Sequence, residues 1–303
     1  MFLGAVVPKI MHTMLSSLAF IKWTHEPHPY IFHITENFGP RWYGLAYVLG
    51  FLGGAWLLVR YAKANPPRSS LPAEKVWDLI ITLVIGVMVG GRVGYFIFYK
   101  PGDFFQNPLV LFRIWEGGMA SHGGFIGVII ALAWFAWRSK IPFLHLGDLA
   151  ASITSFGFML GRIANYMNGE LWGKLTDGTW GVIFAHTDAG PYLRHPSQLY
   201  EAALEGALLF AFAQWRIWRT NVVRMQPGRL AGEYFVLYAV ARVICEYFRE
   251  PDRLIDANGN DISLLFGVMS RGTFYSIFLF IVGAALIVYS IRKFQGTSSR
   301  QTP

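Results

Sequence analysis

Long apolar runs alternate with short polar stretches along this chain. A helix that crosses a bilayer needs about 20 predominantly apolar residues. Seven stretches meet this requirement and predict spanning helices: residues 42–59, 76–98, 118–137, 147–166, 198–215, 230–248 and 266–291. An odd number of spans places the two termini on opposite sides of the membrane. The predicted fold class is therefore an all-α polytopic membrane protein with seven transmembrane helices.

The connections between these spans differ in length and character. Residues 167–197, between the fourth and fifth spans, are long enough for a small extramembrane head, and TWGVIF inside them predicts a short strand. Residues 102–118 are too short and interrupted to span, and amphipathic enough to lie in the membrane interface. The apolar residues 1–24 lack a following small-residue cleavage site, which favours an interfacial helix or peripheral extension.

Lysine and arginine are distributed unequally between the two sides. The loops after the first, third, fifth and seventh spans hold thirteen, and the opposite side holds nine. Cytoplasmic loops carry the excess of these residues. This pattern places the N-terminus outside and the C-terminus in the cytoplasm.

Composition excludes several classes of function. With 54% hydrophobic residues, 15% charged residues and most of the net charge of +8 flanking helices, the chain is suited to anionic lipid headgroups and not to nucleic acid. One cysteine, Cys245, excludes an intramolecular disulfide and a multi-cysteine metal cluster. The cluster His25, Glu26, His28 and His33 lacks helical i,i+4 spacing, so we expect no metal site and no cofactor.

Charged residues inside the apolar runs are candidates for function, because each costs about 2.5 kcal/mol or more at membrane depth. Tyr238, Arg242, Glu246 and Arg249 recur at intervals that keep them on one stripe of the sixth helix. The pair Arg242 and Glu246 could be a structural salt bridge. A second arginine on the stripe favours an anion site instead.

The stretch GRIANYMNGELWG, residues 161–173, ends the fourth span with polar residues. Arg162 and Asn165 share a helix face, and Gly169 allows the chain to leave the helix before Glu170. Arginines on two helices suit a lipid phosphate, since a guanidinium donates two parallel hydrogen bonds to phosphate oxygens. The alternative is a headgroup anchor without chemistry.

Glycine is concentrated in the second and third spans. GGRVGYF, residues 90–96, predicts close helix packing, and so does the glycine-rich surrounding of His122. A single histidine in a helix is more often structural than catalytic, although imidazole is well suited to accept a proton near neutral pH. Spacing alone leaves both roles open for His122.

GRIANYMNGELWG resembles the signature of the bacterial prolipoprotein diacylglyceryl transferases, approximately G-R-x-x-N-[FY]-x-N-x-E-x-x-G. Four further segments resemble the same family in the same order: RWYGLAYVLGF, GGMASHGGFIGV, RHPSQLYEA and ARVICEYFREPD. The resemblance extends from about residue 30 to the last helix and leaves residues 1–24 outside.

The resemblance implies transfer of the sn-1,2-diacylglyceryl group of phosphatidylglycerol to the thiol of the lipobox cysteine of a prolipoprotein. A thioether forms and sn-glycerol 1-phosphate leaves, as the first step of bacterial lipoprotein maturation. His122, Arg162 and Arg242 are then the catalytic residues, with His122 as candidate base. The implied substrate-binding residues are Tyr43, Asn165, Asn168, Glu170, Gly173, Tyr238, Glu246 and Arg249.

The expected organisation follows. Residues 1–24 form an extension, residues 25–293 a transmembrane catalytic domain with a periplasmic head at 167–197, and residues 294–303 a cytoplasmic tail. The expected location is the bacterial inner membrane, with the N-terminus in the periplasm. The expected partners are phosphatidylglycerol, the prolipoprotein signal peptide and membrane lipids.

Two other classes of protein are alternatives for this sequence. A transporter or lipid flippase would use the same arginines to bind an anion, but such proteins often show paired halves with broken helices, and no internal symmetry is visible here. A structural scaffold would not need His122, Arg162 and Arg242 within its spans.

Overall fold

The computed structural model describes residues 21–35, 38–113, 117–178, 180–251, 264–265 and 268–298. The chain divides into two compact units. Unit 1 comprises Met1–Gly50, Ser155–Ala211 and Phe235–Val282, and unit 2 comprises Phe51–Thr154, Phe212–Tyr234 and Gly283–Pro303.

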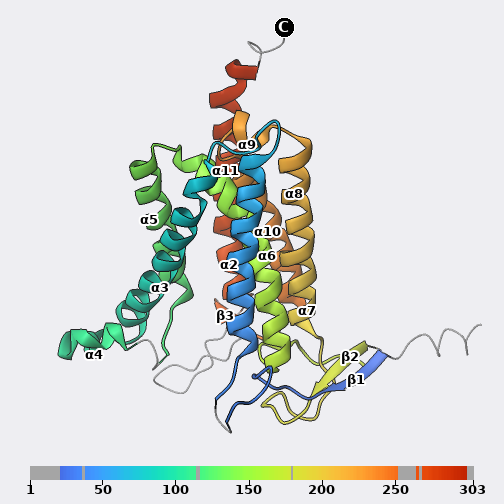
Figure 1. Cartoon of the computed structure of the whole chain (residues 1–303). Coiled ribbons are helices and arrows are strands. Elements are labelled where there is room, and N and C mark those ends of the chain that lie inside the picture. The colour runs from blue at the N-terminus through green and yellow to red at the C-terminus, as the bar shows by residue number, and fades with distance from the viewer. Residues whose placement is uncertain are drawn as a thin grey trace, which may run out of the picture. The chain divides into compact units, whose positions relative to one another are not determined.

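Helices dominate the described residues, and two small sheets accompany them (Figure 1). In chain order the elements are β1 (Ile21–His25), α2 (Trp42–Lys63), η1 (Ala73–Lys75), α3 (Val76–Tyr99), α4 (Pro101–Gln106), η2 (Pro108–Phe112), α5 (Ser121–Ser139), α6 (Phe143–Asn168), β2 (Trp180–Phe184), α7 (Ser197–Glu201), η4 (Ala202–Leu208), α8 (Leu209–Arg219), α9 (Val222–Met225), α10 (Arg229–Phe248), β3 (Leu264–Leu265), β4 (Met269–Ser270) and α11 (Arg271–Ser298). The segment η4 is a π-helical turn that joins α7 to α8.

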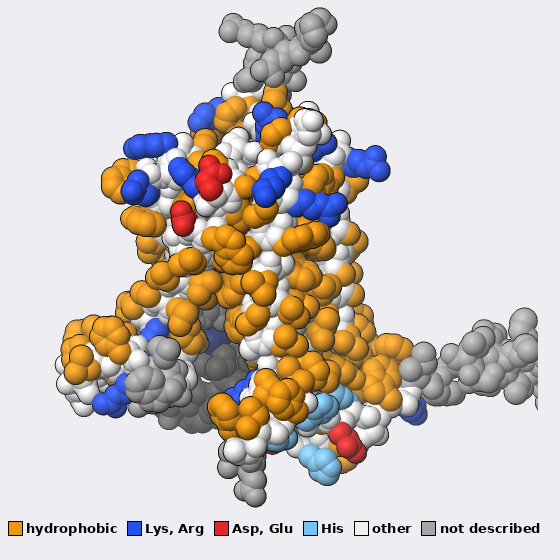
Figure 2. All heavy atoms as spheres, in the orientation of Figure 1, with side chains coloured by type: hydrophobic (Ala, Val, Ile, Leu, Met, Phe, Trp, Pro, Cys, Tyr) orange, Lys and Arg blue, Asp and Glu red, His pale blue; other side chains and the backbone are white. Residues whose placement is uncertain are grey.

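Four helical stretches among the described residues are long and apolar enough to cross a membrane: Trp42–Lys63, Ala73–Tyr99, Phe143–Asn168 and Arg271–Phe294. They match the first, second, fourth and seventh predicted spans. The other three predicted positions are also helical, in α5, in the run from α7 through α8, and in α10. Many large apolar side chains on the helices are exposed, and Figure 2 shows them over much of the helical surface in view.

Some helix bounds differ from those predicted. The third span was predicted to start at residue 118, but α5 starts at Ser121, because Gly117 and Gly118 have φ of 76° and 78°, outside the right-handed helical region. The seventh was predicted to start at residue 266, but β4 precedes α11, and residues 266–267 lie outside the described residues. The predicted tail is helical to Ser298, and residues 299–303 are not described.

In unit 1, the strand predicted from TWGVIF is confirmed at β2. Its partner was not predicted: β1 pairs with β2 in parallel, with Ile21 opposite Trp180 and His25 opposite Phe184. The predicted extension 1–24 therefore ends inside a sheet, and residues 1–20 lie outside the described residues. A small hydrophobic core supports this sheet, formed by Val182, Phe184 and Ala189 with Trp23, Tyr166 and Trp172.

In unit 2, α3 and α5 lie side by side and meet through glycines (Figure 1). A Cβ added at Gly94 would lie 2.6 Å from Cα of Gly123, and one at Gly90 would lie 2.7 Å from Cα of Gly127. The two backbones are therefore too close for any side chain at these positions. This contact confirms the prediction that GGRVGYF mediates helix packing.

A buried carboxylate fixes the start of α10 in unit 2. Asp148 of α6 accepts hydrogen bonds from the backbone N–H groups of Gly228 and Ala231, at 2.8 Å and 2.7 Å. The first N–H groups of a helix have no partners within the helix. Asp148 supplies the missing acceptors, which anchors the helix that carries the predicted arginine stripe.

Candidate functional site

The structure brings the predicted arginines of unit 1 together with buried glutamates. Six charged residues form this cluster, which we call the charged network: Arg162, Glu201, Glu205, Arg242, Glu246 and Arg249. They come from α6, α7, η4 and α10, with Arg249 directly after α10. Separate helices thus place their charged side chains at one point.

Glu201 contacts all three arginines of the charged network. Its Oε2 lies 2.7 Å from Nε of Arg162, and its Oε1 lies 3.6 Å from Nη1 of Arg242 and 3.4 Å from Nη1 of Arg249. The carboxylate side chain is fully buried. A buried charge is costly unless it is paired, and these three ion pairs tie the three guanidinium groups to one carboxylate.

Two further carboxylates complete the charged network. Glu205, also fully buried, has Oε1 at 3.3 Å from Nη1 of Arg242 and Oε2 at 3.8 Å from Nη2 of Arg162. Glu246 pairs with Nη2 of Arg242. Three arginines and three glutamates give a formal charge of zero.

The structure contains the ion pair that the sequence offered as one alternative for Arg242 and Glu246. The pair Arg242 and Glu246 is a salt bridge, as the i,i+4 spacing allowed. The sequence interpretation missed Glu201 and Glu205, and so missed the neutrality of the site. The sequence does contain a signal for them. Both are carboxylates within or at the edge of an apolar run, where charges are rare, and they are spaced i,i+4 from each other.

A π-helical turn carries Glu205. The segment η4 follows directly after Glu201, so the change from α-helix to π-helix falls between the two glutamates. Isolated π-helical turns occur frequently at functional sites. The irregular turn therefore begins between the two residues that anchor the arginines.

A second cluster lies at the end of α6. The amide of Asn165 donates to the hydroxyl oxygen of Tyr43 and to Oε1 of Glu170 at 3.3 Å. Asn168 donates to the same Oε1 at 3.1 Å. Asn165 Oδ1 accepts from Nη1 of Arg162 at 3.4 Å, which joins this cluster to the charged network. Four predicted substrate-binding residues thus lie together beside a predicted catalytic arginine.

Glycines shape the backbone around this cluster. Gly169 has φ of 66°, which ends α6 and turns the chain toward Glu170, as predicted. A Cβ added at Gly44 or at Gly161 would meet nothing within 4 Å. The backbone at Gly44 and Gly161, each next to a predicted site residue, therefore borders open space.

Gly173 lies at a junction of three backbone segments. Its N–H donates to the carbonyl oxygen of His195 at 3.0 Å, its carbonyl accepts from Arg194 at 3.1 Å, and it pairs with Arg249 in an antiparallel bridge. An added Cβ would lie 2.7 Å from the carbonyl oxygen of Phe248. Gly173 thus positions the backbone that carries Arg249.

Burial lowers the pKa of the neighbouring His195 below its ordinary value, and the negative charge of Asp177 opposes this shift.

Strand β1 is tied to α6 by its histidine. Nε2 of His25 lies 2.8 Å from the carbonyl oxygen of Tyr166, and the two rings stack with centroids 4.3 Å apart. Burial lowers the pKa of His25 below its ordinary value, and the charge of His28 acts in the same direction. The His25 side chain therefore serves as a neutral packing group between β1 and α6.

Tyr238 lies on α10, one turn before Arg242, with its ring stacked on Phe158 at 5.6 Å. All four members of the predicted stripe are thus found on α10 or at its end.

Cys245 is fully buried on the same helix. No group of three His, Cys, Asp or Glu side chains that could hold a metal ion occurs within the described part of the chain.

His122 lies in the first turn of α5, in unit 2, and its side chain is exposed. Arg92 of α3 fixes the segment that precedes α5. Its guanidinium donates to the carbonyl oxygens of Val110 and Arg113 at 2.7 Å, of Leu111 at 3.2 Å, and also of Gly117 and Gly118. The backbone at these positions before His122 is therefore held by a buried cation of the GGRVGYF stretch.

Comparisons with known proteins show the family of this chain. The profile of the family described as prolipoprotein diacylglyceryl transferase matches residues 29–289. A phosphatidylglycerol–prolipoprotein diacylglyceryl transferase of Bradyrhizobium diazoefficiens is 42% identical over 262 residues, covering 84% of this chain and 89% of the relative. Proteins of the same name from Aliivibrio salmonicida and Aeromonas hydrophila are 39% and 42% identical, and cover 88% and 86% of this chain and 89% and 90% of their own lengths. The chain therefore belongs to the prolipoprotein diacylglyceryl transferase family.

Proposed function

We propose that this protein transfers the sn-1,2-diacylglyceryl group from phosphatidylglycerol to the thiol of the lipobox cysteine of a prolipoprotein. The products are a thioether-linked lipoprotein precursor and sn-glycerol 1-phosphate, and no cofactor takes part. The observation that carries the proposal is the joining of Arg162 and Arg242, from two helices, through the same buried carboxylates of Glu201 and Glu205.

The two arginines act on the leaving group. A phosphate monoester leaves as the carbon–oxygen bond breaks, and cations placed in advance on its oxygens lower the barrier as negative charge develops. The glutamates of the charged network fix the guanidinium groups before the substrate arrives. Fixed donors need no reorganisation during the reaction, which is the source of their effect.

The cysteine thiol is the nucleophile, and His122 is its base. A thiol with a pKa near 8.5 is mostly protonated at neutral pH, so removal of its proton raises the concentration of the reactive thiolate. Imidazole is the side chain best suited to accept that proton. Cys245 takes no part, because the nucleophile arrives with the precursor.

The remaining residues position the phosphate and glycerol of the lipid. Tyr43, Asn165, Asn168 and Glu170 form a hydrogen-bonded cluster joined to Arg162 and offer hydroxyl, amide and carboxylate groups to the glycerol hydroxyls. Tyr238, Glu246, Arg249 and Gly173 orient the arginines from α10 and from the backbone junction.

In the bacterial inner membrane, seven helices cross the bilayer. The three that add to the four long apolar helices are α5, the run from α7 through α8, and α10. Lysine and arginine side chains gather around the helix ends near α9 (Figure 2), which supports a cytoplasmic location for that end. The N-terminus and the head at 167–197 are then periplasmic, within a catalytic domain of residues 25–293 that precedes a cytoplasmic tail.

The test uses the purified full chain in detergent with phosphatidylglycerol and a lipobox peptide. Release of glycerol phosphate and a gain of one diacylglyceryl mass on the peptide are expected, and a Cys→Ser peptide should give neither. If the folded protein gives neither product with the cysteine peptide, the transferase assignment is wrong. Movement of phosphatidylglycerol across proteoliposome membranes without peptide modification would then favour the flippase alternative.

A further inference from the structure

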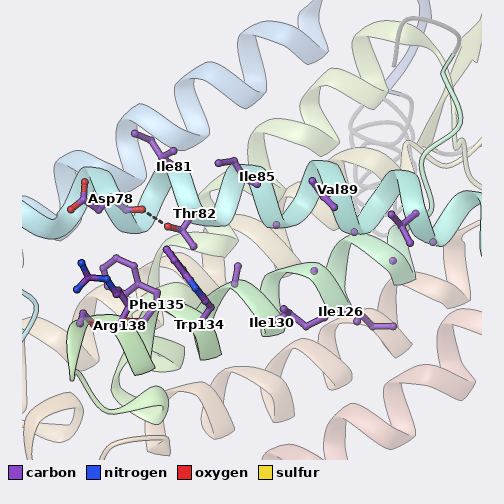
Figure 3. A pocket seen from close by; sticks show the side chains of 18 of the residues that line it. Asp78, Ile81, Thr82, Ile85, Val89, Ile126, Ile130, Trp134, Phe135 and Arg138 are labelled. Atoms are coloured by element: carbon purple, nitrogen blue, oxygen red, sulfur yellow. Dashed lines mark hydrogen bonds between the residues drawn. The ribbon is translucent and has the colours of Figure 1, made fainter. Parts of the chain in front are cut away.

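Beside the glycine contact of unit 2, a groove of about 1010 Å³ runs along α3 and α5 (Figure 3). This volume is at the upper end of the roughly 300–1,000 Å³ usual for small-molecule sites. Its walls carry branched and aromatic side chains: Ile81, Ile85, Val89, Ile126, Ile130 and Trp134. Its floor is formed by Gly86, Gly90, Gly94, Gly123 and Gly127. The absence of side chains at the helix contact therefore creates the hollow.

The groove is polar at one end only. Lys75, Asp78 and Thr82 line it on the α3 side, and Arg138 and Ser139 line it where α5 ends. In Figure 3, Asp78 and Arg138 lie at the same end, while Val89 and Ile126 lie toward the other. The charged groups of the lining are two cations and one anion, so this end has a net charge of +1.

These features fit one amphiphile. From Lys75 at the end of η1 to Val89 in α3, the lining extends about 21 Å at 1.5 Å per residue. This length is enough to cover the roughly 15 Å hydrocarbon depth of one leaflet. Wall residues such as Ile85, Ile130 and Trp134 are more than half exposed. An apolar surface of this length with cations at one end is complementary to acyl chains joined to an anionic headgroup.

We propose that the groove between α3 and α5 binds an anionic phospholipid, with its acyl chains on the isoleucine walls and its phosphate between Lys75 and Arg138. The groove lies wholly in unit 2, whereas the charged network belongs to unit 1. His122, the proposed base, and Arg138 lie at opposite ends of α5, about 24 Å apart at 1.5 Å per residue. A lipid with its phosphate between Lys75 and Arg138 is therefore distinct from a substrate whose headgroup reaches His122. A signal peptide fits the same groove poorly, because its basic amino-terminal region would meet Lys75 and Arg138.

Trp134 provides a probe inside the groove. The experiment uses the full chain in nanodiscs with brominated acyl chains on either phosphatidic acid or phosphatidylcholine, at equal mole fraction and without acceptor peptide. Phosphatidic acid is chosen because it is not the proposed substrate. Quenching in the wild type minus quenching in Trp134→Phe isolates the signal of this residue from that of the other tryptophans.

We expect brominated phosphatidic acid to bind about fivefold more tightly than brominated phosphatidylcholine, from a net charge of one at the membrane surface. Lys75→Gln combined with Arg138→Gln should abolish this preference. Lys140→Gln is the matched control, since Lys140 follows α5 but does not line the groove, and should retain it.

Equal quenching by the two lipids in the wild type would overturn the proposal. An unchanged preference in the Lys75 and Arg138 variant would also overturn it, and so would displacement of the lipid by a basic signal peptide but not by unlabelled phosphatidic acid. Diacylglyceryl transfer is measured in parallel. If the wild type shows the lipid preference but no transfer, the proposed function is contradicted and the groove assignment stands.

Discussion

Nε of Arg162 lies 2.7 Å from Oε2 of Glu201, although the two residues come from different helices and the carboxylate is fully buried. The same carboxylate contacts Arg242 and Arg249. Arginine positions on α6 and α10 are therefore coupled through one residue of α7. The positions of the arginines proposed to act on the leaving group and the stability of unit 1 therefore depend on the same charge.

Replacing Glu201 with glutamine should destabilise the protein by about 3–5 kcal/mol, because it leaves an uncompensated positive charge among buried groups. Denaturant unfolding in detergent measures this change. The matched control is Asp103→Asn, which breaks the exposed pair of Asp103 with Lys100 and should cost less than about 1 kcal/mol.

A second substitution distinguishes charge balance from packing. Arg249→Met in the Glu201→Gln background removes the excess charge and should recover part of the lost stability. Strictly additive losses in this double-mutant cycle would contradict the coupling of the two residues through the charged network.

Replacing Gly272 with alanine should lower kcat/KM by about a hundredfold. A Cβ at this position in α11 would collide with Oε1 of Glu246 and lie 3.1 Å from Nε of Arg242, so the pair must move, and small displacements of catalytic groups have effects of this size. Gly147→Ala is the control, because its Cβ would meet nothing within 4 Å. Equal kcat/KM in both variants would show that this pair does not act in the reaction.

Replacing Gly173 with alanine should reduce stability by about 1–3 kcal/mol and reduce activity with it. The new Cβ would collide with two backbone carbonyl oxygens, those of His195 and Phe248, which cannot rotate away as a side chain can. Thermal unfolding in detergent, compared with Gly102→Ala in open space, measures the effect. A variant with normal stability and only a raised KM would instead assign Gly173 to direct substrate binding.

Replacing His122 with alanine should lower kcat by about 10²- to 10⁴-fold at neutral pH if it removes the thiol proton. The deficit should shrink as the pH rises toward 9, because the substrate thiol then ionises without a base. Peptide modification rates from pH 6.5 to 9 test this. A deficit that stays constant over this range would contradict the base role, and no deficit at all would mean that the arginines alone stabilise the thiolate.

The lowered pKa of His25 predicts a dependence of stability on pH. Between the folded pKa and about 6.5, the unfolded chain binds more protons than the folded chain, so stability is full above about pH 6.5 and falls as the pH drops through that window. Comparing Tm from pH 8 to 5 for the wild type and His25→Phe isolates this contribution. Parallel curves would show that His25 is not protonated on unfolding.

Local signals in the sequence predicted much of unit 1. The motif around Arg162 and Asn165 predicted a helix ending in polar groups, and Gly169 has the positive φ that its exit from the helix requires. The stripe on α10 followed from its period alone. These features depend on neighbours within one or two helical turns, where sequence spacing determines which side chains share a face.

Features that depend on distant partners were not predicted. Strand β1 pairs with β2 from a remote part of the chain, and a short apolar segment gives no sign of its partner. Glu201 and Glu205 neutralise arginines on other helices, so their role depends on tertiary packing. The start of α11 was misplaced because apolar residues continue through β4, and hydrophobicity alone does not separate the two.

Arg92 has a consequence for how this protein tolerates sequence change. Its guanidinium donates to the main-chain oxygens of Val110, Leu111, Arg113, Gly117 and Gly118, so these hydrogen bonds hold the backbone without specifying the side chains at those positions. Exposed residues such as Leu109 and Phe112 could vary among apolar types while the loop keeps its course. Variation in homologous chains should therefore be frequent at these surface positions and rare at Arg92, which no other side chain replaces as a five-donor group.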